Sequence, residues 1–564
     1  GGVDVTLVLS GDSVAQPVAT LVFTPASHDF GAVQVGDTGV FDVTLENTGN
    51  PDAENLSLAD PAAPFSQSHN CPAALQPAAQ CTVTVEFTPT SVGSFSDNVL
   101  ASADGGVNGT LTLSGEAVVG SVYTRYFAEG AVGPFFDTRF ALFNPGPVDA
   151  EATLRFADGA GQTATHTVSV PAVSQVEIDA ESVVPATWAA LVTIVEADQP
   201  LITSRTMTWG GAAPWGTHRS AGVVAPQTTW WLSEGATGVF SLFYLVYNPH
   251  DQAAQIEATY LRAAGEPPVT RTYTLPPQAR TTIFVNAPDG VTPDPELGNT
   301  ALSARILSTN AVPIVVERAM YLTTDSAQPF TAGTIAPAVS APLTHWTFAE
   351  GATGFFELFL CLTNPHDEVA TATVRYLRPT GGPVEQTVTL APESRRTVWV
   401  NLEAADLPAA GTTVAMEVEA DHPILAERAM WWGSGAPWWA GHAGPGVEAP
   451  ASRWALAGMT AGGPGEVEPY LLLVNPHASA AEATLTLYFD DGTAPAKVTV
   501  PLGARNRTTV RLLNVVPEAD GRRFGVVIES SDGTQPLVIE GATYATVNGQ
   551  PLSTGDLVPA VPLP

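Results

Sequence analysis

The chain has 564 residues, of which 45% are hydrophobic and 14% are charged, so it can form several cores and is not disordered by composition. Its 56 acidic and 22 basic residues give a net charge of −34, which disfavours nucleic acid and anionic membrane surfaces as partners. The 50 Gly and 48 Pro are spread along the chain, a pattern typical of short strands joined by turns. No stretch approaches 18 apolar residues, so we expect no membrane insertion. The chain begins with Gly and has no signal peptide, and we expect it to be mature or cut from a longer protein.

Residues 1–18 are expected to be an orphan strand and a linker. The stretch Gly2–Gly11 mimics Gly106–Gly115, which closes the next domain. It is therefore the closing strand of a missing domain, as in a truncated tandem array, or a donor strand for a neighbouring copy. A donor strand would add to a sheet of another subunit and link copies head to tail. Against this, the next domain already has its own closing strand. The apolar residues of the possible donor strand are Val3, Val5, Leu7 and Leu9.

Residues 19–118 are expected to form one β-sandwich. Cys71 and Cys81 lie close together beside strand-like sequence, which favours a local disulfide and an oxidising compartment. The elements Phe30-Gly31, Val35-Gly36 and Asn47-Thr48-Gly49 resemble those of the ASH-type, or choice-of-anchor D, immunoglobulin-like domain of bacterial surface proteins. That family often carries such a disulfide.

Four copies of a longer repeat follow. Asn-Pro pairs begin at positions 144, 248, 364 and 475, a period that suits independent sandwich domains. The expected domains are 119–225, 226–341, 342–450 and a degenerate copy at 451–564. In the third copy, period-two alternation in 373–377 and 387–390 indicates strands with one face buried and the other exposed. The predicted fold class is all-β, with tandem immunoglobulin-like β-sandwiches in an elongated array.

The four copies resemble an uncharacterised repeat of secreted bacterial proteins. The shared elements are Trp-x-Phe-Ala-Glu-Gly, Asn-Pro and Glu-Arg-x-Met-Tyr, seen here in 346–351, 364–365 and 317–321. The resemblance implies a secreted location and a β-sandwich architecture. It implies no activity.

An acidic and a basic residue recur together in the first three copies. The acidic member belongs to a Glu-Gly pair and the basic member lies near the end of the copy; the pairs are Glu129 with Arg205, Glu234 with Arg318, and Glu350 with Arg428. The fourth copy has lost both, to Ala457 and Gly541. Joint loss indicates a partly buried ion pair, because either charge alone would be left without a partner. We predict that each pair ties the first and last strands of its domain or stitches a domain junction; an active site is the less favoured alternative.

Six tryptophans lie in Gly-, Ala- and Pro-rich stretches near the ends of the first and third copies. They are Trp209, Trp215, Trp431, Trp432, Trp438 and Trp439. Exposed indole rings can stack on sugars, which would make a carbohydrate-binding module. We favour packing at domain junctions.

The sequence contains no metal-ligand spacing, phosphate-binding loop or nucleophile elbow, so we expect no metal, no cofactor and no enzymatic activity. The preferred function is a non-catalytic structural or adhesive protein, extracellular or on a bacterial cell surface. More specifically, we expect a subunit of an appendage or filament, with copies of itself or other surface proteins as partners. The alternative is an accessory, polysaccharide-binding stalk of a large secreted hydrolase.

Overall fold

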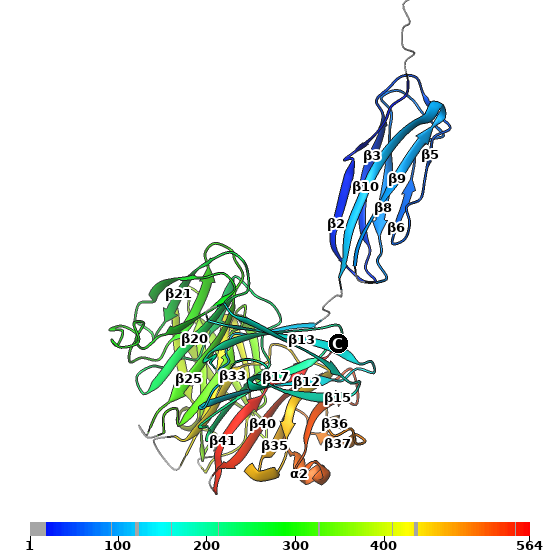
Figure 1. Cartoon of the computed structure of the whole chain (residues 1–564). Coiled ribbons are helices and arrows are strands. Elements are labelled where there is room, and N and C mark those ends of the chain that lie inside the picture. Colours follow the sequence, from blue (N-terminus) through cyan, green and yellow to red (C-terminus); the bar gives the residue numbers. More distant parts are fainter. Residues whose placement is uncertain are drawn as a thin grey trace, which may run out of the picture. The chain divides into compact units, whose positions relative to one another are not determined.

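The computed structural model describes residues 18–563, with gaps at 92, 119–122, 160, 186, 212–213, 325–327, 409, 434–437 and 548. The chain divides into two compact units, residues 1–121 and residues 122–564 (Figure 1). β-Strands make up nearly all of the regular structure in both units, which confirms the all-β prediction.

The first unit is a β-sandwich of two four-stranded sheets. Their strand orders are β1-β3-β8-β6 and β2-β10-β9-β5, and a short β4–β7 pair lies beside them. Along β8, every second side chain enters the core because successive residues of a strand point to opposite faces. The bounds are β1 (Leu21–Thr24), β2 (Ser27–Gln34), β3 (Gly39–Asn47), β4 (Ala53–Glu54), β5 (Ser57–Leu58), β6 (Phe65–His69), β7 (Ala74–Leu75), β8 (Gln80–Phe87), β9 (Gly93–Ala103), η1 (Asp104–Gly106) and β10 (Val107–Val118).

Two predictions concern this unit. Cys71 and Cys81 form a disulfide, as expected. Strand β10 lies in the middle of its sheet, between β2 and β9, so the closing strand of this sandwich comes from the domain itself. The possible donor strand with Val3, Val5, Leu7 and Leu9 lies outside the described residues.

The second unit contains four sandwiches, which we call repeats 1 to 4. Each has a first sheet and a second sheet, and in repeat 1 their orders are β11-β16-β13-β14 and β15-β12-β17-β18. Repeat 2 has the equivalent orders β19-β24-β21-β22 and β23-β20-β25-β26. The bounds are β11 (Tyr123–Phe127), β12 (Phe136–Asn144), β13 (Ala150–Asp158), β14 (Thr163–Val170), β15 (Ser174–Asp179), η2 (Ala180–Ser182), β16 (Leu191–Ala197), β17 (Ile202–Trp209), β18 (Gly216–Ser220), β19 (Thr229–Leu232), β20 (Phe240–Asn248), β21 (Ala254–Leu261), β22 (Val269–Leu275), β23 (Ala279–Phe284), β24 (Ser303–Ser308), β25 (Val315–Leu322) and β26 (Ala332–Pro337).

Repeats 3 and 4 keep this topology with small variations. In repeat 3 the long strand β32 serves both sheets, because it pairs with β27 and β29 in one half and with β28 and β33 in the other. In repeat 4 a short C-terminal strand, β42, adds to the first sheet beside β34. The bounds are β27 (Leu343–Phe348), β28 (Phe356–Asn364), β29 (Ala370–Leu377), β30 (Val384–Leu390), β31 (Ser394–Trp399), α1 (Val400–Glu403), β32 (Ala415–Trp432), β33 (Ala440–Pro445), β34 (Arg453–Thr460), η3 (Gly463–Gly465), β35 (Glu468–Asn475), β36 (Ala481–Phe489), β37 (Ala496–Leu502), β38 (Asn506–Arg511), α2 (Leu512–Val515), η4 (Pro517–Ala519), β39 (Arg523–Ser530), β40 (Val538–Val547), β41 (Gln550–Val558) and β42 (Val561–Pro562).

The four repeats close into a ring. Their last strands contact one another in a cycle, β18 with β26, β26 with β33, β33 with β41, and β41 with β18. Between neighbours, the first sheet of one repeat packs on the second sheet of the next, as β11 does on β25 and β34 on β17. The prediction of an elongated array is therefore wrong for residues 122–564, although the tandem sandwiches themselves are confirmed.

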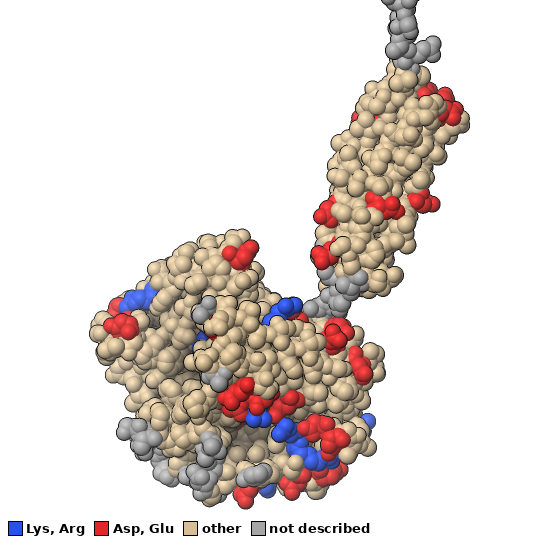
Figure 2. Space-filling model, viewed as in Figure 1, with Lys and Arg blue, Asp and Glu red and all other residues tan. Residues whose placement is uncertain are grey.

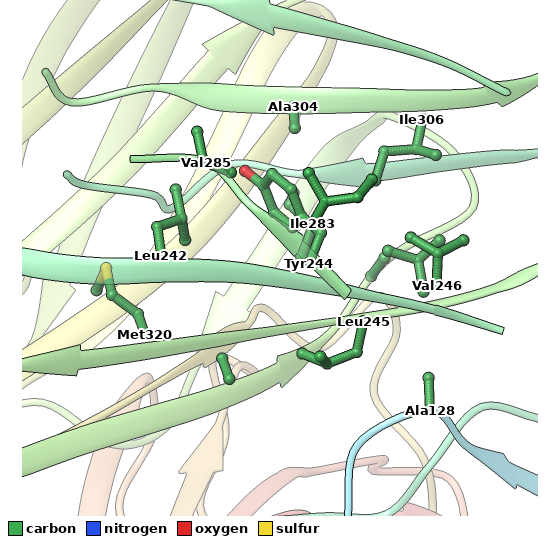
Figure 3. Packing of buried hydrophobic residues seen from close by; sticks show 14 of the residues in the cluster. Ala128, Leu242, Tyr244, Leu245, Val246, Ile283, Val285, Ala304, Ile306 and Met320 are labelled. Carbon is green, nitrogen blue, oxygen red and sulfur yellow. The ribbon is translucent and has the colours of Figure 1, made fainter. Parts of the chain in front are cut away.

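Apolar packing explains why the repeats do not form a row. Strand β25 is buried along its whole length, as expected for a sheet covered on both faces. One continuous cluster of buried side chains joins residues of repeats 1, 2 and 3, and Figure 3 shows Ala128 of repeat 1 near the core residues of repeat 2. A further cluster, which contains Phe143 and Ala455, joins repeat 4 back to repeat 1. A row of separated domains would expose all of these surfaces to water.

Candidate functional site

Three equivalent buried ionic links hold the repeats together. They are made by Arg205, Arg318 and Arg428, whose side chains are fully buried. Each guanidinium donates to the main-chain carbonyl of the Glu-Gly glutamate in its own repeat. It also pairs with a glutamate of the next repeat: Arg205 with Glu317 at 2.9 Å, Arg318 with Glu427 at 2.5 Å, and Arg428 with Glu540 at 3.0 Å.

The predicted pairing of each Glu-Gly carboxylate with the arginine of the same copy needs correction. Those carboxylates cross the junction and face a different arginine: Glu129 lies 3.7 Å from Arg280, Glu234 lies 3.8 Å from Arg395, and Glu350 lies 3.6 Å from Arg507. The arginine of the same copy binds the main chain of the Glu-Gly turn instead. Each junction therefore contains two acidic and two basic side chains, drawn from both repeats.

The alternation of side chains along a strand explains the direction of these links. Glu317 and Arg318 are neighbours in β25 and so point to opposite faces of the sheet. Glu317 bonds backward to repeat 1, and Arg318 bonds forward to repeat 3. Sequence reasoning missed Glu317, Glu427 and Glu540 as partners because it compared residues within a copy and not between successive copies.

Burial governs the electrostatics of these links. It raises the pKa of Glu129, Glu427 and Glu540, and the neighbouring arginines oppose that rise. The carboxylates also accept main-chain hydrogen bonds: Glu317 accepts from the amide of Glu129, and Glu427 from the amide of Ser233. A charge on either side would be costly without its partner, so each link enforces contact between two repeats.

The junction between repeats 4 and 1 has different chemistry. The amide of Gly458 donates to the side chain of Gln175 at 2.7 Å, and Arg219 donates to the carbonyl of Gly458 at 2.5 Å. The amide and the carbonyl of Gly458 are both bonded across the junction to repeat 1, whereas the carbonyl of each Glu-Gly glutamate accepts from an arginine of its own repeat. Gly458, rather than Ala457, occupies the position of that glutamate, because it lies four residues after Trp454 just as Glu350 lies four residues after Trp346. The φ of Gly458 is +73°, and an added Cβ would lie 3.0 Å from Cβ of Ala141. A glutamate at this position would meet both backbone strain and close contact.

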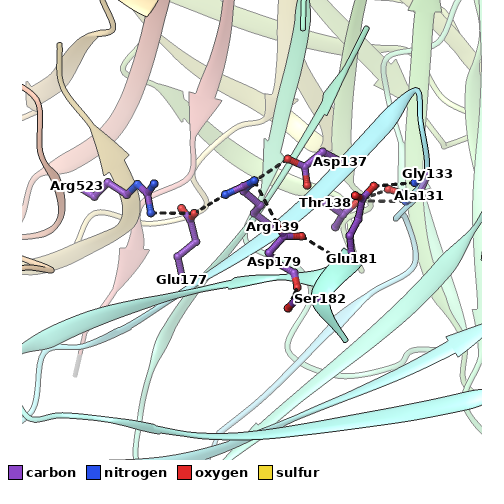
Figure 4. A network of polar contacts seen from close by, with 10 residues as sticks. All are labelled: Ala131, Gly133, Asp137, Thr138, Arg139, Glu177, Asp179, Glu181, Ser182 and Arg523. Atoms are coloured by element: carbon purple, nitrogen blue, oxygen red, sulfur yellow. Dashed lines mark hydrogen bonds and ion pairs between the residues drawn. The ribbon is translucent and has the colours of Figure 1, made fainter. Parts of the chain in front are cut away.

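A partly exposed network adds polar contacts to this closing junction. Arg523 of repeat 4 pairs with Glu177 of repeat 1 at 3.0 Å, and Glu177 also pairs with Arg139 (Figure 4). Arg139 further contacts Asp137 and Asp179. Arg523 is 47% exposed, so water screens this pair and it contributes little to stability. Two contacts shielded from water also cross this junction: the apolar cluster that contains Phe143 and Ala455, and the buried pair of Arg219 with Asp556 at 3.4 Å.

Four of the six tryptophans close two equivalent junctions. The indole N–H groups of Trp209 and Trp215 both donate to the carbonyl of Phe330 in repeat 2. In the same way, Trp432 and Trp439 donate to the carbonyl of Leu552 in repeat 4. The remaining two, Trp431 and Trp438, stack on each other and contact Phe240 across the junction of repeats 2 and 3. The structure thus places all six tryptophans at junctions between repeats.

We call the tryptophan pairs Trp209/Trp215 and Trp432/Trp439 the aromatic plugs of their junctions. A buried histidine lies beside each plug. Nε2 of His218 is hydrogen-bonded to the hydroxyl of Tyr321 at 3.1 Å, and His442 makes the equivalent contact with Tyr544. Burial lowers the pKa of both imidazoles well below its ordinary value, and the nearby Arg205 and Arg428 lower it further. Both rings are therefore neutral at physiological pH.

The last strands of the repeats also border a cavity of about 410 Å³ near the ring axis. All four repeats contribute to its mainly apolar wall, for example with Arg219, Pro337, Pro445 and Leu557. This cavity therefore depends on ring closure. Within the described residues, no group of three or more His, Cys, Asp or Glu side chains is placed to hold a metal ion. Among the described helices, none combines the length and apolar character needed to cross a membrane.

Acidic side chains outnumber basic ones on the visible surface of both units (Figure 2). Acidic groups lie over both units, and on the face of the ring shown in Figure 2 the basic groups lie mostly beside acidic ones. This fits a chain in which 56 acidic residues face 22 basic ones. The acidic surface disfavours polyanionic ligands.

Comparison with known proteins assigns the first unit and leaves the ring without a described activity. Residues 19–116 match a model for the HYDIN/CFA65/VesB-like, Ig-like domain, so the first unit is an immunoglobulin-like domain. Residues 115–288 match a family of unknown function, DUF5719, which covers repeat 1 and part of repeat 2. A search of curated proteins finds no match.

Several solved structures resemble parts of the chain. The ASH/PapD-like domain of human CEP192 is 19% identical, covers 21% of this chain and 99% of its own, and has a TM-score of 0.17. The Vibrio cholerae VesB protease is 20% identical over 18% of this chain and 32% of its own, with a TM-score of 0.14. Domains 5–6 of the S-layer protein SbsC are 15% identical over 36% of this chain and 97% of their own, with a TM-score of 0.14. At these TM-scores the likenesses carry no functional argument.

Breaking one ionic link should destabilise the ring strongly. In Arg318→Ala the carboxylate of Glu427 stays buried without its cation, and we expect a loss of about 3–5 kcal/mol in the free energy of unfolding. The double variant Arg318→Ala/Glu427→Ala should lose less, because no unpaired charge remains. Urea unfolding of the full chain measures both. Equal losses in the single and double variants would contradict a buried, coupled link.

The buried histidines should make the ring sensitive to acid. Their folded pKa lies below the unfolded value of about 6.5, so the unfolded state binds protons first and stability falls as pH drops below that value. The raised pKa of Glu129, Glu427 and Glu540 acts in the opposite direction, and it does so equally in the wild type and in a histidine variant. The variant His218→Gln/His442→Gln removes only the histidine contribution. Urea unfolding at pH 8 and pH 5.5 should show a smaller pH-dependent loss in the variant than in the wild type, and equal losses would contradict this account.

Proposed function

We propose that the chain is a non-catalytic structural or adhesive protein of the bacterial cell surface. The main support for this proposal is that the buried charged residues pair with one another between repeats. The acidic and basic side chains at the three ionic junctions bind one another across repeats, as Arg318 and Glu427 do. Such residues serve the cohesion of the ring.

A closed ring is suited to presenting surfaces rigidly. Each repeat is held on both sides by apolar clusters and by buried ion pairs, and the pair at the junction of repeats 4 and 1 joins Arg219 to Asp556. Because every repeat contacts both of its neighbours, no repeat can rotate about its linker without breaking these contacts. We therefore propose that residues 122–564 act as a rigid head for contact, joined to an immunoglobulin-like domain.

The disulfide and the charge support an extracellular location. The Cys71–Cys81 bond favours an oxidising compartment, whereas Cys361 is buried and free. The thiol of Cys361 donates to Glu234, and burial raises its pKa, which disfavours the reactive thiolate. The net charge of −34 disfavours nucleic acid as a partner.

Surface location can be tested on the bacterium that makes the protein. We expect an antibody against the ring to label intact cells. We also expect Cys71 and Cys81, in protein taken from these cells, to react with alkylating reagents only after reduction. Cys361 should react in denaturant without reduction and so serves as the internal control. Labelling only after permeabilisation, with all three cysteines reduced, would contradict the proposal.

Self-association into a filament is the more specific form of this proposal. It rests on residues 2–11, whose sequence mimics that of β10. Because β10 lies between β2 and β9, a strand from a second copy would pair at a sheet edge or displace β10. A head-to-tail contact of this kind does not close on itself and would build a filament.

Electron microscopy tests this form directly. Negative-stain images of residues 1–564 should show filaments, and images of a version that lacks residues 1–14 should show single particles. The shortened protein is the matched control, because the ring and the disulfide are unchanged. Single particles in both samples would exclude strand-mediated assembly and would leave the contact function of the ring in place.

A further inference from the structure

The junction between repeats 2 and 3 contains an open groove. One end is a notch of about 140 Å³ with aromatic walls, formed by Phe240, Phe359, Trp431 and Trp438. The other end is a hollow of about 430 Å³. The two share three lining residues, Ala301, Arg395 and Thr397, so they form one continuous groove.

Two substitutions distinguish this junction from the plugged ones. Phe240 pairs with Leu322, whereas the equivalent partners of Phe136 and Phe356 are Trp209 and Trp432. The residue before Phe240 is Val239, and Phe355 occupies that position in repeat 3. Smaller side chains thus replace the aromatic plug at this junction. Trp438 and Phe359 remain partly exposed in the groove.

The floor of the groove carries a buried cation with a free donor. The side chain of Arg395 is 4% exposed, and its Nε has no hydrogen-bond partner among the residues that the structure describes. Another nitrogen of the same guanidinium, Nη2, lies 3.8 Å from Glu234. The same Nε is unpartnered in Arg280, the equivalent residue at the junction of repeats 1 and 2, whereas Arg395 lines the groove, where a ligand oxygen can approach its guanidinium.

The far end of the groove is rich in hydroxyl groups. Thr300, Thr389 and Thr397 line the larger hollow, and β31 brings Thr397 next to Arg395 on one strand and one rim. The groove has aromatic faces at one end and hydroxyl and guanidinium groups at the other. A sugar ring needs both kinds of surface, because it has an apolar C–H face and polar hydroxyl groups at its edge. The C–H face of a hexose packs on an indole, and its hydroxyls take the hydrogen bonds.

We infer that this groove binds a neutral glycan, with a hexose ring stacked at Trp438 and hydroxyl groups bound by Arg395 and Thr397. The charge balance selects neutral sugars. The charge of Arg395 is opposed by Glu234, and the net charge of −34 repels polyanions. Of the six tryptophans, Trp209, Trp215, Trp432 and Trp439 already donate their N–H groups to carbonyls at the two plugged junctions.

Affinity electrophoresis of the full chain tests the inference. Native gels would contain laminarin, galactomannan, xyloglucan or hydroxyethyl cellulose as neutral polymers, and polygalacturonate as the acidic one. We expect at least one neutral polymer to retard the wild type, and Trp438→Ala to weaken that binding about tenfold or more. The matched control is Phe355→Ala, an aromatic that is 46% exposed and lies outside the groove, and its binding should be unchanged.

A second variant protects the test against misfolding. Thr397→Val keeps the side-chain shape and removes one hydroxyl, so it should weaken binding without altering the thermal unfolding curve. If Trp438→Ala proves unfolded, the binding of Thr397→Val decides whether the groove is the glycan site. The inference is overturned if no neutral polymer retards the wild type, if only polygalacturonate does so, or if the groove variants bind as well as Phe355→Ala.

Discussion

The ring depends on a buried arginine that finds its carboxylate in the next repeat. Because Glu317 and Arg318 are adjacent in β25, one points to the preceding repeat and the other to the following repeat. Each of these charges is buried by contact with a neighbouring repeat, so its desolvation is compensated only when the matching partner is present. The same dipeptide therefore makes each middle repeat dependent on two neighbours. Sandwich domains of an ordinary tandem array have no such requirement.

The two end repeats show how such a series can stop. Repeat 1 has Ser204 before Arg205, and repeat 4 has Gly541 after Glu540, so the series of links begins with an arginine and ends with a glutamate. Retaining the missing pair would have placed a glutamate on the end face of repeat 1 and an arginine on the end face of repeat 4. Such ends could bind those of another copy as readily as each other. Small residues at both positions remove that alternative, and the ring closes through the apolar cluster, the Gly458–Gln175 hydrogen bond and the Arg219–Asp556 pair.

The sequence predicts the sandwiches well and their arrangement poorly. Period-two alternation and the repeated Asn-Pro turns depend on local chemistry, and they indicate the strands of each copy. The loss of both the Glu and the Arg from the fourth copy correctly indicates that the arginines are buried. The partner of Arg205, however, is 112 residues away, in another copy. A signal for the ring was present in 315–322, where apolar residues occupy both faces of one strand around Glu317 and Arg318. The roles of the tryptophans depend on carbonyls at Phe330 and Leu552, whose positive φ values only the folded chain reveals.

Departures from the repeat symmetry are more informative about function than the symmetry itself. The plugs at junctions 1–2 and 3–4 are equivalent, whereas junction 2–3 has Trp431 where the others have Tyr321 and Tyr544. Without that phenol, Glu234 accepts from the thiol of Cys361, while Glu350 accepts from Tyr544. The Arg318–Glu427 link persists, so cohesion does not require the plug at this junction. A position where packing is no longer needed for cohesion is free to evolve a surface for contact with another molecule.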